Sequence, residues 1–361
     1  MDTRYNTICR KMSFVILAFN FYFHSHFSLI KKVFAPNLVI NLVLILSASV
    51  SGCGPGCEIR EPQSEISLKI NGIGSSVKDT DSLDVFVFND DRSRRLDSYQ
   101  RMASINSGKV GIASRSGDKI IFVLANSGMA RFGWYEVNCY QSLDKIFVRL
   151  EDESRDAPSM TAAVAVSATD NEVVAVNLKP LCCEVVINSI RCDFSGMPYS
   201  GEKIRGAKAF LMNVNAEFPV SGESSGGATR LINSYHLDER DVGWFSDKRL
   251  IVQEFSADIG NAPLSDEIAL RCFPNCPESE TAGSPRTRLV IEGDIEGFTY
   301  FWAFPVGEEG EGVERNNRYM YDITINRKGT TSPDQDAEAE DVTIKMTVEQ
   351  WKEKDNYDVM F

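Results

Sequence analysis

The feature that most constrains the fold of this chain is a set of strand-length segments with an apolar residue at every second position. In 319–328 (YMYDITINRK) tyrosine and isoleucine alternate with polar residues, and 341–351 (DVTIKMTVEQW) alternates more strictly. A period of two means that one face is packed and the other solvated, which is typical of an antiparallel sandwich. Other segments are apolar or β-branched runs of strand length: 82–90, 119–126, 161–168, 172–178, 183–190, 208–218 and 288–306.

Two turns and one helix are expected within this pattern. The turn residues 169–171 (Thr-Asp-Asn) predict a hairpin of the two segments that flank them. The run 288–306 predicts two strands joined between Gly293 and Gly297. The segment 142–150 (SLDKIFVRL) has apolar residues at helical spacing behind a serine that can cap a helix. The expected fold class is all-β, with two antiparallel β-sandwich domains and at most one or two short helices.

The strand groups divide into two similar parts at Lys179–Pro180, because proline cannot donate a hydrogen bond to a sheet and tends to mark strand ends. We expect an N-terminal sandwich over 53–180 and a C-terminal sandwich over 181–361, each long enough for a core of its own. Residues 1–52 are expected to comprise an upstream extension and a signal peptide.

The segment before the first sandwich has the layout of a lipoprotein signal peptide. Two lysines precede the apolar run 38–45, which is too short to span a bilayer, and small residues then lead to VSGC at 50–53. This tetrapeptide resembles the bacterial lipobox and predicts cleavage between Gly52 and Cys53, with acylation of Cys53. An ordinary cleaved signal is the alternative. Residues 1–29 contain no cleavage site, which a start codon assigned too far upstream would explain.

Charge and histidine content exclude several functions. The chain carries 38 Lys and Arg against 51 Asp and Glu, a net charge of −13, so it repels phosphate backbones and no nucleic acid is expected as a partner. The motifs GxSxG, HExxH and GxxxxGK[ST] are absent from the sequence, and His236, the one histidine beyond the signal region, lies in a polar segment that predicts a surface loop. We expect neither enzyme activity nor a cofactor.

The acidic stretch 334–341 offers oxygen ligands at alternate positions, as a calcium loop could. It lacks the glycine and the spaced final carboxylate of an EF-hand, so the prediction is a solvated acidic loop and no metal site.

The cysteines suggest one covalent link. Cys272 and Cys276, in CFPNC, could close a small loop at a turn set by Pro274 and Asn275, and they form the candidate disulfide. Most of the other cysteines are expected to be buried small apolar residues with a free thiol.

Aromatic clusters offer a second kind of site. The pairs Trp134–Tyr135 and Trp244–Phe245 lie near polar turns and could stack sugars if exposed. The aromatic residues of 298–304 alternate along a strand and are expected in the core.

A series of segments follows one another in a specific order and spacing: 83–91 (LDVFVFNDD), 96–101, 117–127, 183–196, 198–204, 209–217, 271–278, 287–301, 315–334 and 348–361. Together they resemble the fimbrillin-like lipoproteins of Bacteroidales, the subunits of type V pili, and within them the anchor or minor-subunit branch. The resemblance spans nearly the whole chain after Cys53. It implies two transthyretin-like β-sandwich domains, a lipid-anchored precursor and assembly by strand exchange.

The function that this resemblance implies is that of a non-enzymatic structural component of a surface pilus. Such an anchor or minor subunit joins other fimbrillin subunits by β-strand complementation, in which an incoming strand satisfies open backbone groups along a sheet edge. The expected location is the outer membrane, held through the acylated Cys53 and exposed at the cell surface. A cell-surface glycan-binding lipoprotein is the alternative, and a hydrolase is less favoured because no acid–base pair stands out.

Whether the first strand, expected at 65–73, can be removed by proteolysis distinguishes an anchor subunit from a stalk subunit. In the family that the sequence resembles, stalk precursors lose this strand to an arginine-specific protease. Here Arg60 precedes the strand and the next arginine, Arg92, lies beyond the second strand, so no cut removes the first strand alone. This favours an anchor, with a tip subunit as the closest alternative.

The C-terminal tail continues the alternation of the last strand, with Tyr357, Val359 and Phe361 on one face. Since chain ends are usually frayed, the tail is expected to pack into a groove. That groove belongs either to its own sandwich, as an ordinary last strand, or to a neighbouring subunit.

Overall fold

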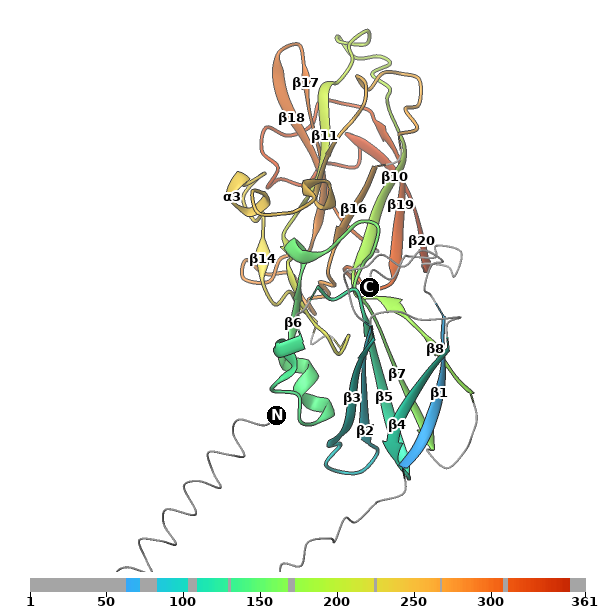
Figure 1. Ribbon diagram of the computed structural model, residues 1–361. Helices are drawn as coiled ribbons and strands as arrows, with labels where there is room; N and C mark the ends of the chain where they lie inside the picture. Colours follow the sequence, from blue (N-terminus) through green and yellow to red (C-terminus); the bar gives the residue numbers. More distant parts are fainter. Residues whose placement is uncertain are drawn as a thin grey trace, which may run out of the picture. The chain divides into compact units, whose positions relative to one another are not determined.

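Strands dominate the described part of the chain (Figure 1). Contacts divide the chain into two compact units, Met1–Arg60 and Glu61–Phe361, and every described residue belongs to the second. The computed structural model describes residues 63–71, 83–102, 109–128, 131–167, 173–223, 226–266, 268–307 and 311–350.

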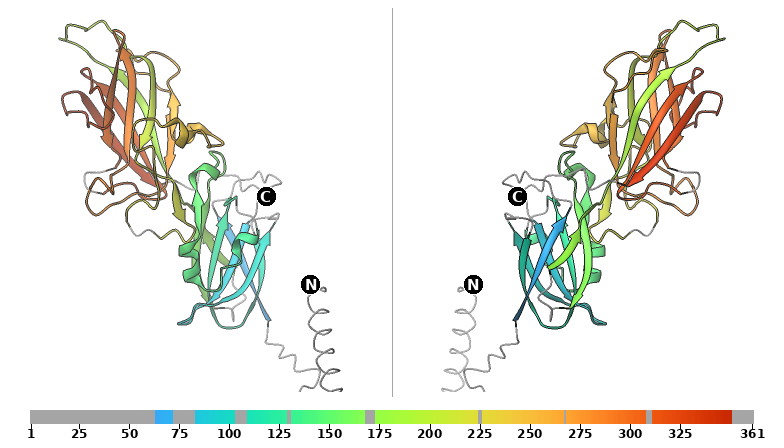
Figure 2. Two further views of the ribbon diagram at one scale, coloured as in Figure 1. Left: turned by 90° about the vertical axis from the view of Figure 1, so that its left-hand side faces the viewer. Right: turned by 90° about the vertical axis from the view of Figure 1, so that its right-hand side faces the viewer.

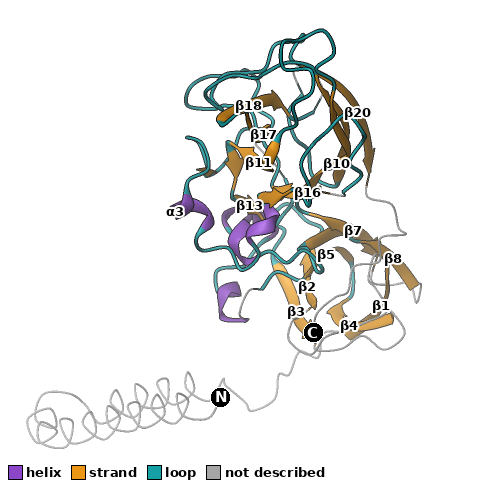
Figure 3. Cartoon of the chain, turned by 90° about the horizontal axis from the view of Figure 1, so that it is seen from above, coloured by secondary structure: helices purple, strands orange, loops and turns teal. Residues whose placement is uncertain are grey.

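Helical structure is sparse among these residues, as Figure 3 shows. The one α-helix described is α3 (Glu239–Val242), capped by Asp238, whose side chain accepts a hydrogen bond from the backbone N–H of Arg240. The prediction of an all-β fold is confirmed. The 3-10 turns are η1 (Arg131–Trp134), η2 (Tyr140–Lys145), η3 (Leu150–Asp152) and η4 (Lys248–Leu250).

Residues 63–180, called the N-terminal half below, form two sheets around one core. Pairing is antiparallel throughout, except that β1 and β8 run parallel. Aliphatic residues of both sheets fill the space between them, among them Leu68, Val85 and Val123. One sheet has the order β3 (Leu96–Met102), β2 (Leu83–Asn89), β5 (Asp118–Ala125), β7 (Met160–Ser167), β9 (Lys179–Pro180), and the other β4 (Lys109–Arg115), β1 (Gln63–Asn71), β8 (Val173–Asn177).

Residues 181–350, the C-terminal half, form two four-stranded sheets. Here too one pair, β10 with β19, is parallel and the rest are antiparallel. The two views of Figure 2 show these strands in yellow-green to red. One sheet has the order β16 (Ile268–Cys272), β10 (Cys183–Cys192), β19 (Asn317–Ile325), β20 (Val342–Gln350), and the other β15 (Val252–Glu254), β11 (Arg205–Met212), β17 (Arg288–Ile295), β18 (Phe298–Pro305).

Two short ladders complete the pairing. In one, β12 (Val214–Asn215) pairs with β14 (Leu231–Ile232). In the other, β13 (Glu217–Pro219) of the C-terminal half pairs with β6 (Phe147–Arg149) of the N-terminal half. The domain boundary predicted at Lys179–Pro180 coincides with β9, after which β10 opens the second group of strands. It remains a prediction.

The continuous apolar run of β2 follows from burial on both of its faces. Val85 and Val87 point into the core of the N-terminal half. Phe86 and Phe88 point the other way, where Phe86 meets the Trp134 ring edge-on at 5.2 Å between ring centroids. A strand covered on both sides has no polar face, so strict alternation is lost.

The predicted turns and helix have mixed outcomes. The hairpin of 288–306 is confirmed: Glu296 and Gly297, both with positive φ (53° and 82°), join β17 to β18 as a two-residue turn. The hairpin around 169–171 is wrong, because β7 and β8 belong to different sheets and face each other across the core. The helix predicted over 142–150 is found only in part. Residues 142–145 lie in the 3-10 turn η2, whereas residues 147–149 form β6 and pair with β13, where tertiary pairing overrides the helical spacing.

Candidate functional site

The first strand, β1, occupies the centre of its sheet (Figure 1). It pairs antiparallel with β4, from Gln63 opposite Arg115 to Lys69 opposite Lys109, and parallel with β8, from Ser67 opposite Val173. Among the described residues, β4 and β8 pair with no strand other than β1. Removing β1 would therefore leave open backbone donors and acceptors on two facing strand edges, which we call the first-strand groove.

Three side chains of β1 fill the floor of this groove. Ile66, Leu68 and Ile70 are 3%, 0% and 5% exposed and pack in the core of the N-terminal half. Burial of such a side chain is worth about 1.5–3 kcal/mol relative to water. A strand with apolar residues at three alternate positions therefore matches the groove in both backbone pairing and side-chain shape.

The walls of the first-strand groove are held independently of β1. On one side, Ser98 Oγ of β3 donates to Ala113 O of β4 at 2.8 Å, and Asp97 Oδ2 accepts from the backbone N of Arg115 at 2.9 Å. On the other side, the chain runs from β8 directly into β9, which pairs with β7 at Met160. Each wall is thus tied to the opposite sheet by contacts that do not involve β1.

The last described strand, β20, is placed very differently. It pairs with β19 over its full length, from Val342 opposite Ile325 to Gln350 opposite Asn317, and its other edge meets no described strand. Val342 is 7% exposed, whereas Val348 on the same face is 39% exposed. Burial of β20 thus weakens toward Gln350.

Arg315, in the loop before β19, joins the two halves. Its guanidinium donates to the backbone oxygens of Lys179 (2.9 Å), Pro180 (3.3 Å) and Gly222 (3.2 Å) and to Thr161 Oγ1 (3.0 Å). A side chain on Gly222, whose φ is +79°, would collide with Arg315 Nη1. Burial lowers the pKa of Arg315 to about 10, so it stays charged at neutral pH.

A buried ion-pair network lies at the base of β10. Glu184 Oε1 accepts from Arg271 Nη2 at 3.2 Å, and Glu184 Oε2 lies 3.0 Å from Arg318 Nε. Arg271 Nη1 also donates to Ser154 O of the N-terminal half at 3.1 Å. Next to Ser154, burial raises the pKa of Glu153 to about 7.

The sequence patterns do not identify these junction residues. Arg315 and Arg271 carry no periodic signal, and their partners are mainly backbone oxygens far away in the sequence. A charged residue inside an otherwise apolar strand, such as Glu184 in CEVVINSI, is the one signal that could have found them.

The structure does not bring together the two cysteines of the predicted disulfide. The segment between them is extended, since Phe273 forms a bridge with Asn215 and Asn275 one with Val313. Four residues of extended chain separate Cα atoms by about 13 Å, beyond the reach of a disulfide. In the structure, neither Cys272 nor Cys276 is part of a disulfide.

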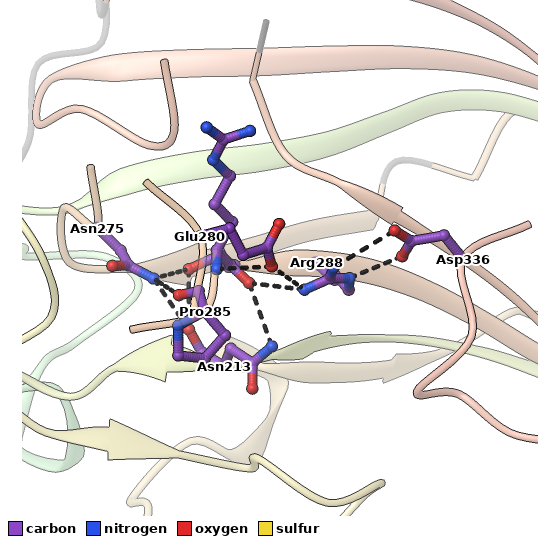
Figure 4. A network of polar contacts seen from close by, with 8 residues as sticks. Asn213, Asn275, Glu280, Pro285, Arg288 and Asp336 are labelled. Carbon is purple, nitrogen blue, oxygen red and sulfur yellow. Dashed lines mark hydrogen bonds and ion pairs between the residues drawn. The ribbon is translucent and has the colours of Figure 1, made fainter. Parts of the chain in front are cut away.

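The acidic stretch 334–341 is tied to β17 by an arginine (Figure 4). Arg288 donates to Asp336 Oδ1 at 2.7 Å and Oδ2 at 3.3 Å, and to Glu280 Oε1 at 2.7 Å. Asp341 Oδ2 accepts from the backbone N of Glu338 at 3.3 Å. These carboxylates serve ion pairs and turns, and no group of three or more possible metal ligands occurs in the described ranges.

The aromatic residues divide between core and surface. Trp134 and Phe245 are buried, whereas Trp244 and Tyr135 are 63% and 88% exposed. Each pair predicted as a sugar platform therefore has one buried ring and one exposed ring. Of the aromatic residues of 298–304 expected in the core, Trp302 and Phe304 are buried, but Phe298 is 67% exposed.

The one histidine of the described chain, His236, lies in a loop, as expected, but its ring is engaged. The side chain is 47% exposed and meets the rings of Phe210 and Phe301 edge-on, at centroid distances of 5.9 and 5.2 Å.

A pocket of about 360 Å³ lies beside the β6–β13 ladder. Phe147, Phe218 and Pro219 give it apolar walls, and the carboxylates of Asp144 and Glu223 lie at the same pocket. Burial and then these two negative charges raise the pKa of the nearby Tyr140. The pocket thus combines apolar surface with hydrogen-bond acceptors.

Comparison with solved structures identifies the fold of this chain. No protein-family model and no curated protein sequence matches the chain. A proposed cell adhesion protein from Bacteroides eggerthii aligns with a TM-score of 0.60 at 16% identity, over 82% of this chain and 98% of that one. A fimbrilin from Porphyromonas gingivalis aligns with a TM-score of 0.52 at 11% identity, over 80% and 97%. The chain has a fimbrillin-like fold.

A further solved structure of this fold is a proposed cell adhesion protein from Parabacteroides distasonis, with a TM-score of 0.55 at 15% identity over 79% of this chain and 96% of that one. The resemblance to fimbrillin-like proteins found in the sequence is thereby confirmed at the level of the fold. Among the residues that the structure describes, no helix is long and apolar enough to cross a bilayer.

Several predicted residues lie outside the described ranges. They are Gly52 and Cys53 at the predicted cleavage and lipidation site, Arg60, and the tail residues 351–361. The structure leaves the predictions made for them as they stand.

Proposed function

We propose that this protein is a non-enzymatic structural subunit of a surface pilus, joined to neighbouring subunits by β-strand complementation. The observation that carries the proposal is the position of β1 between β4 and β8, two strands that pair with no other described strand. The fold shared with a fimbrilin supports a fibre role, and the fold shared with proposed adhesion proteins supports a place at the cell surface.

The anchor role is proposed because cleavage at an arginine residue cannot remove β1 alone. Arg92 lies in an exposed turn between β2 and β3, and β2 is paired on both sides. A cut at Arg92 would remove β1 together with β2, whose residues Leu83 to Phe88 are all buried. A subunit that keeps β1 keeps its own groove filled, so it ends a fibre rather than extending it. We place it at the base, through acylation of Cys53 and retention on the outer membrane.

The donor element would be the C-terminal strand region. Its edge position and its fading burial make β20 the least firmly packed of the long strands in its sheet. The alternating tail that follows it would lie in a neighbour's groove.

The proposal is tested by purifying assembled surface fibres and identifying their chains by mass spectrometry. We expect this chain to be present, to begin at an acylated Cys53, and to retain residues 63–71. Absence from the fibres would contradict the subunit role. A mature N-terminus between Asn71 and Asp84 would contradict the anchor role, and immunogold label at the distal fibre end would favour a tip subunit.

The matched control for the lipid anchor is Cys53→Ser. This variant should accumulate as unprocessed or unanchored chain, whereas Cys57→Ser, four positions away, should behave as wild type. Outer-membrane fractions that contain Cys53→Ser at the wild-type level would contradict acylation.

Glycan binding remains a second candidate because of the pocket beside β6. Its volume falls within the range of small-ligand sites, and its carboxylates could accept hydrogen bonds from sugar hydroxyls above the Phe147 ring. A glycan array would detect saturable binding. The variant Glu223→Ala should abolish that binding if the pocket is responsible, and Glu239→Ala, in α3, is the control.

A further inference from the structure

Two buried cysteines face each other across a sheet of the C-terminal half. Cys183 is the first residue of β10, Cys272 is the last of β16, and they are direct cross-strand partners. Both are 0% exposed, and their Sγ atoms lie 3.3 Å apart. Opposed residues of an antiparallel pair have Cα atoms about 4.5–5.5 Å apart, a separation that a disulfide can span.

The sulfur of Cys276, by contrast, is committed elsewhere. It donates to Val313 O at 3.1 Å, on the far side of the extended segment that separates it from Cys272. In the described part of the chain, the 3.3 Å approach of Cys183 to Cys272 is the one sulfur–sulfur contact recorded.

We propose that Cys183 and Cys272 form a disulfide when the chain folds in an oxidising compartment. The inference rests on the proposed export of the chain, because thiols stay reduced in the cytosol. The oxidant is a disulfide of a thiol-oxidising protein or small molecule. One cysteine thiolate attacks it and releases a thiol; the second thiolate attacks the mixed disulfide and releases the other. The chain loses two protons and two electrons, and the oxidant's disulfide becomes two thiols.

The position of the link gives it a mechanical role. The two cysteines are 89 positions apart, so the bond closes a long loop and restricts the unfolded chain. It also lies where the chain passes from β9 into β10. Tension that reaches β10 from the N-terminal half is shared with β16 through a covalent bond, rather than carried by the β10 hydrogen bonds alone.

The test is peptide mapping of the full chain under non-reducing conditions. The chain is collected from the cell envelope, its free thiols are blocked with iodoacetamide, and it is digested and examined by mass spectrometry. We expect a cross-linked pair of peptides that contain Cys183 and Cys272. Reduction should lower the melting temperature by about 5–15 °C. Cys272 linked to Cys276, or Cys183 and Cys272 both alkylated, overturns the proposal.

Variants separate the neighbouring thiols. Cys182→Ala and Cys276→Ala should keep the cross-link, whereas Cys183→Ala and Cys272→Ala should abolish it. Because a core variant can fail to fold, the wild-type chain is also refolded with reduced and oxidised glutathione. If the refolded chain links and the envelope chain does not, the two cysteines can pair but stay reduced in the cell, which overturns the proposal and leaves the pilus role unaffected. If neither links, the pairing itself is wrong, and the pilus role is unaffected.

Discussion

The two halves of the molecule share one pattern of strand pairing, and each half adds one strand of its own to it. In each half the first strand pairs antiparallel on one side and parallel on the other, and four equivalent strands lie in the facing sheet. In the N-terminal half the two-residue strand β9 extends that facing sheet beyond β7. The C-terminal half adds β20 beside β19, and no described strand takes that place beside β8. The equivalent strands are β1, β2, β3, β4, β5, β7 and β8 in the first half and β10, β11, β15, β16, β17, β18 and β19 in the second.

The different positions of the two first strands in the chain indicate where the proposed strand exchange would occur. The counterpart of β1 is β10, which lies mid-chain and is anchored at its base by Glu184 and its two arginine partners. Removing β10 would disrupt the path of the chain, whereas β1 precedes every other described strand. The strand exchange proposed above is therefore assigned to the first-strand groove. The strand that the C-terminal half adds, β20, lies at the opposite end of the described chain, where it is weakly buried.

The largest expected effect comes from charging the core face of each first strand. Leu68→Asp and Val185→Asp each place an unpaired carboxylate at a fully buried site, which costs about 4 kcal/mol or more. For Leu68→Asp we expect β1 to leave its sheet while the C-terminal half stays folded. Limited proteolysis with mass spectrometry should then find a stable C-terminal fragment, and Val185→Asp should yield none.

Leu68→Met, which conserves volume, is the control and should resist proteolysis like the wild type. If neither Leu68→Asp nor Val185→Asp yields a stable C-terminal fragment, the claim that the two first strands differ in their importance for the fold is contradicted.

The next effect tests the junction between the halves by pH. Because burial raises the pKa of Glu153 to about 7, the folded chain binds this proton more tightly than the unfolded chain. Between the unfolded value of 4.5 and pH 7, Glu153 therefore lowers stability as pH rises, by up to about 3 kcal/mol. Glu153→Gln should remove this loss, which urea unfolding at pH 4.5, 6 and 8 would measure.

The exposed neighbour variant Asp156→Asn serves as the control and should follow the wild-type pH profile. A constant difference between Glu153→Gln and wild type across the three pH values would argue against a buried, protonated Glu153.

A smaller effect is expected from Arg315, which donates three hydrogen bonds to oxygen atoms of the N-terminal half and one to Gly222 O of its own half. Arg315→Ala should cost about 2 kcal/mol, because several acceptors lose a charged donor. Arg315→Lys should recover less than half of that, since an ammonium cannot reproduce the guanidinium fork. We expect calorimetry to show one unfolding transition for the wild type and two for Arg315→Ala. Full recovery by lysine would indicate that charge alone matters here.

The smallest effect concerns the extra strand. Val342→Thr should destabilise the chain by about 1 kcal/mol, and Val348→Thr by less than about 0.5 kcal/mol, because burial of β20 declines along its length. Chemical denaturation of the two variants gives the comparison. Equal losses would mean that residues near Gln350 are packed more firmly than the structure indicates.

The sequence predicts the strands better than their partners. Period-two patterns place Tyr319, Tyr321 and Ile323 correctly on one buried face, because alternation reflects local geometry. The failed hairpin at 169–171 has a non-local cause. The sequence suggests that β7 and β8 are neighbours in one sheet, but β8 pairs with β1, where Val173 lies opposite Ser67. Turn chemistry alone does not distinguish a hairpin from a crossing between sheets.

Part of the candidate site can be predicted from the sequence. The apolar face of β1, with Ile66, Leu68 and Ile70, is visible in the alternation and is confirmed as buried. That β1 separates β4 from β8 is a matter of long-range topology, and so is the pairing of Cys183 with Cys272. The sequence spacing of CFPNC favoured the nearer cysteine because spacing says nothing of an extended backbone.

The central claim, that β1 occupies an exchangeable groove, is tested most directly by complementation with a peptide. A chain that lacks residues 61–72 is mixed with a synthetic peptide of residues 63–71, and binding is measured by calorimetry together with the melting temperature. The account predicts saturable one-to-one binding and recovery of the full-length melting temperature. It predicts neither for a control peptide with aspartate at positions 66, 68 and 70. A truncated chain that melts like the full chain, or that binds both peptides equally, would contradict it.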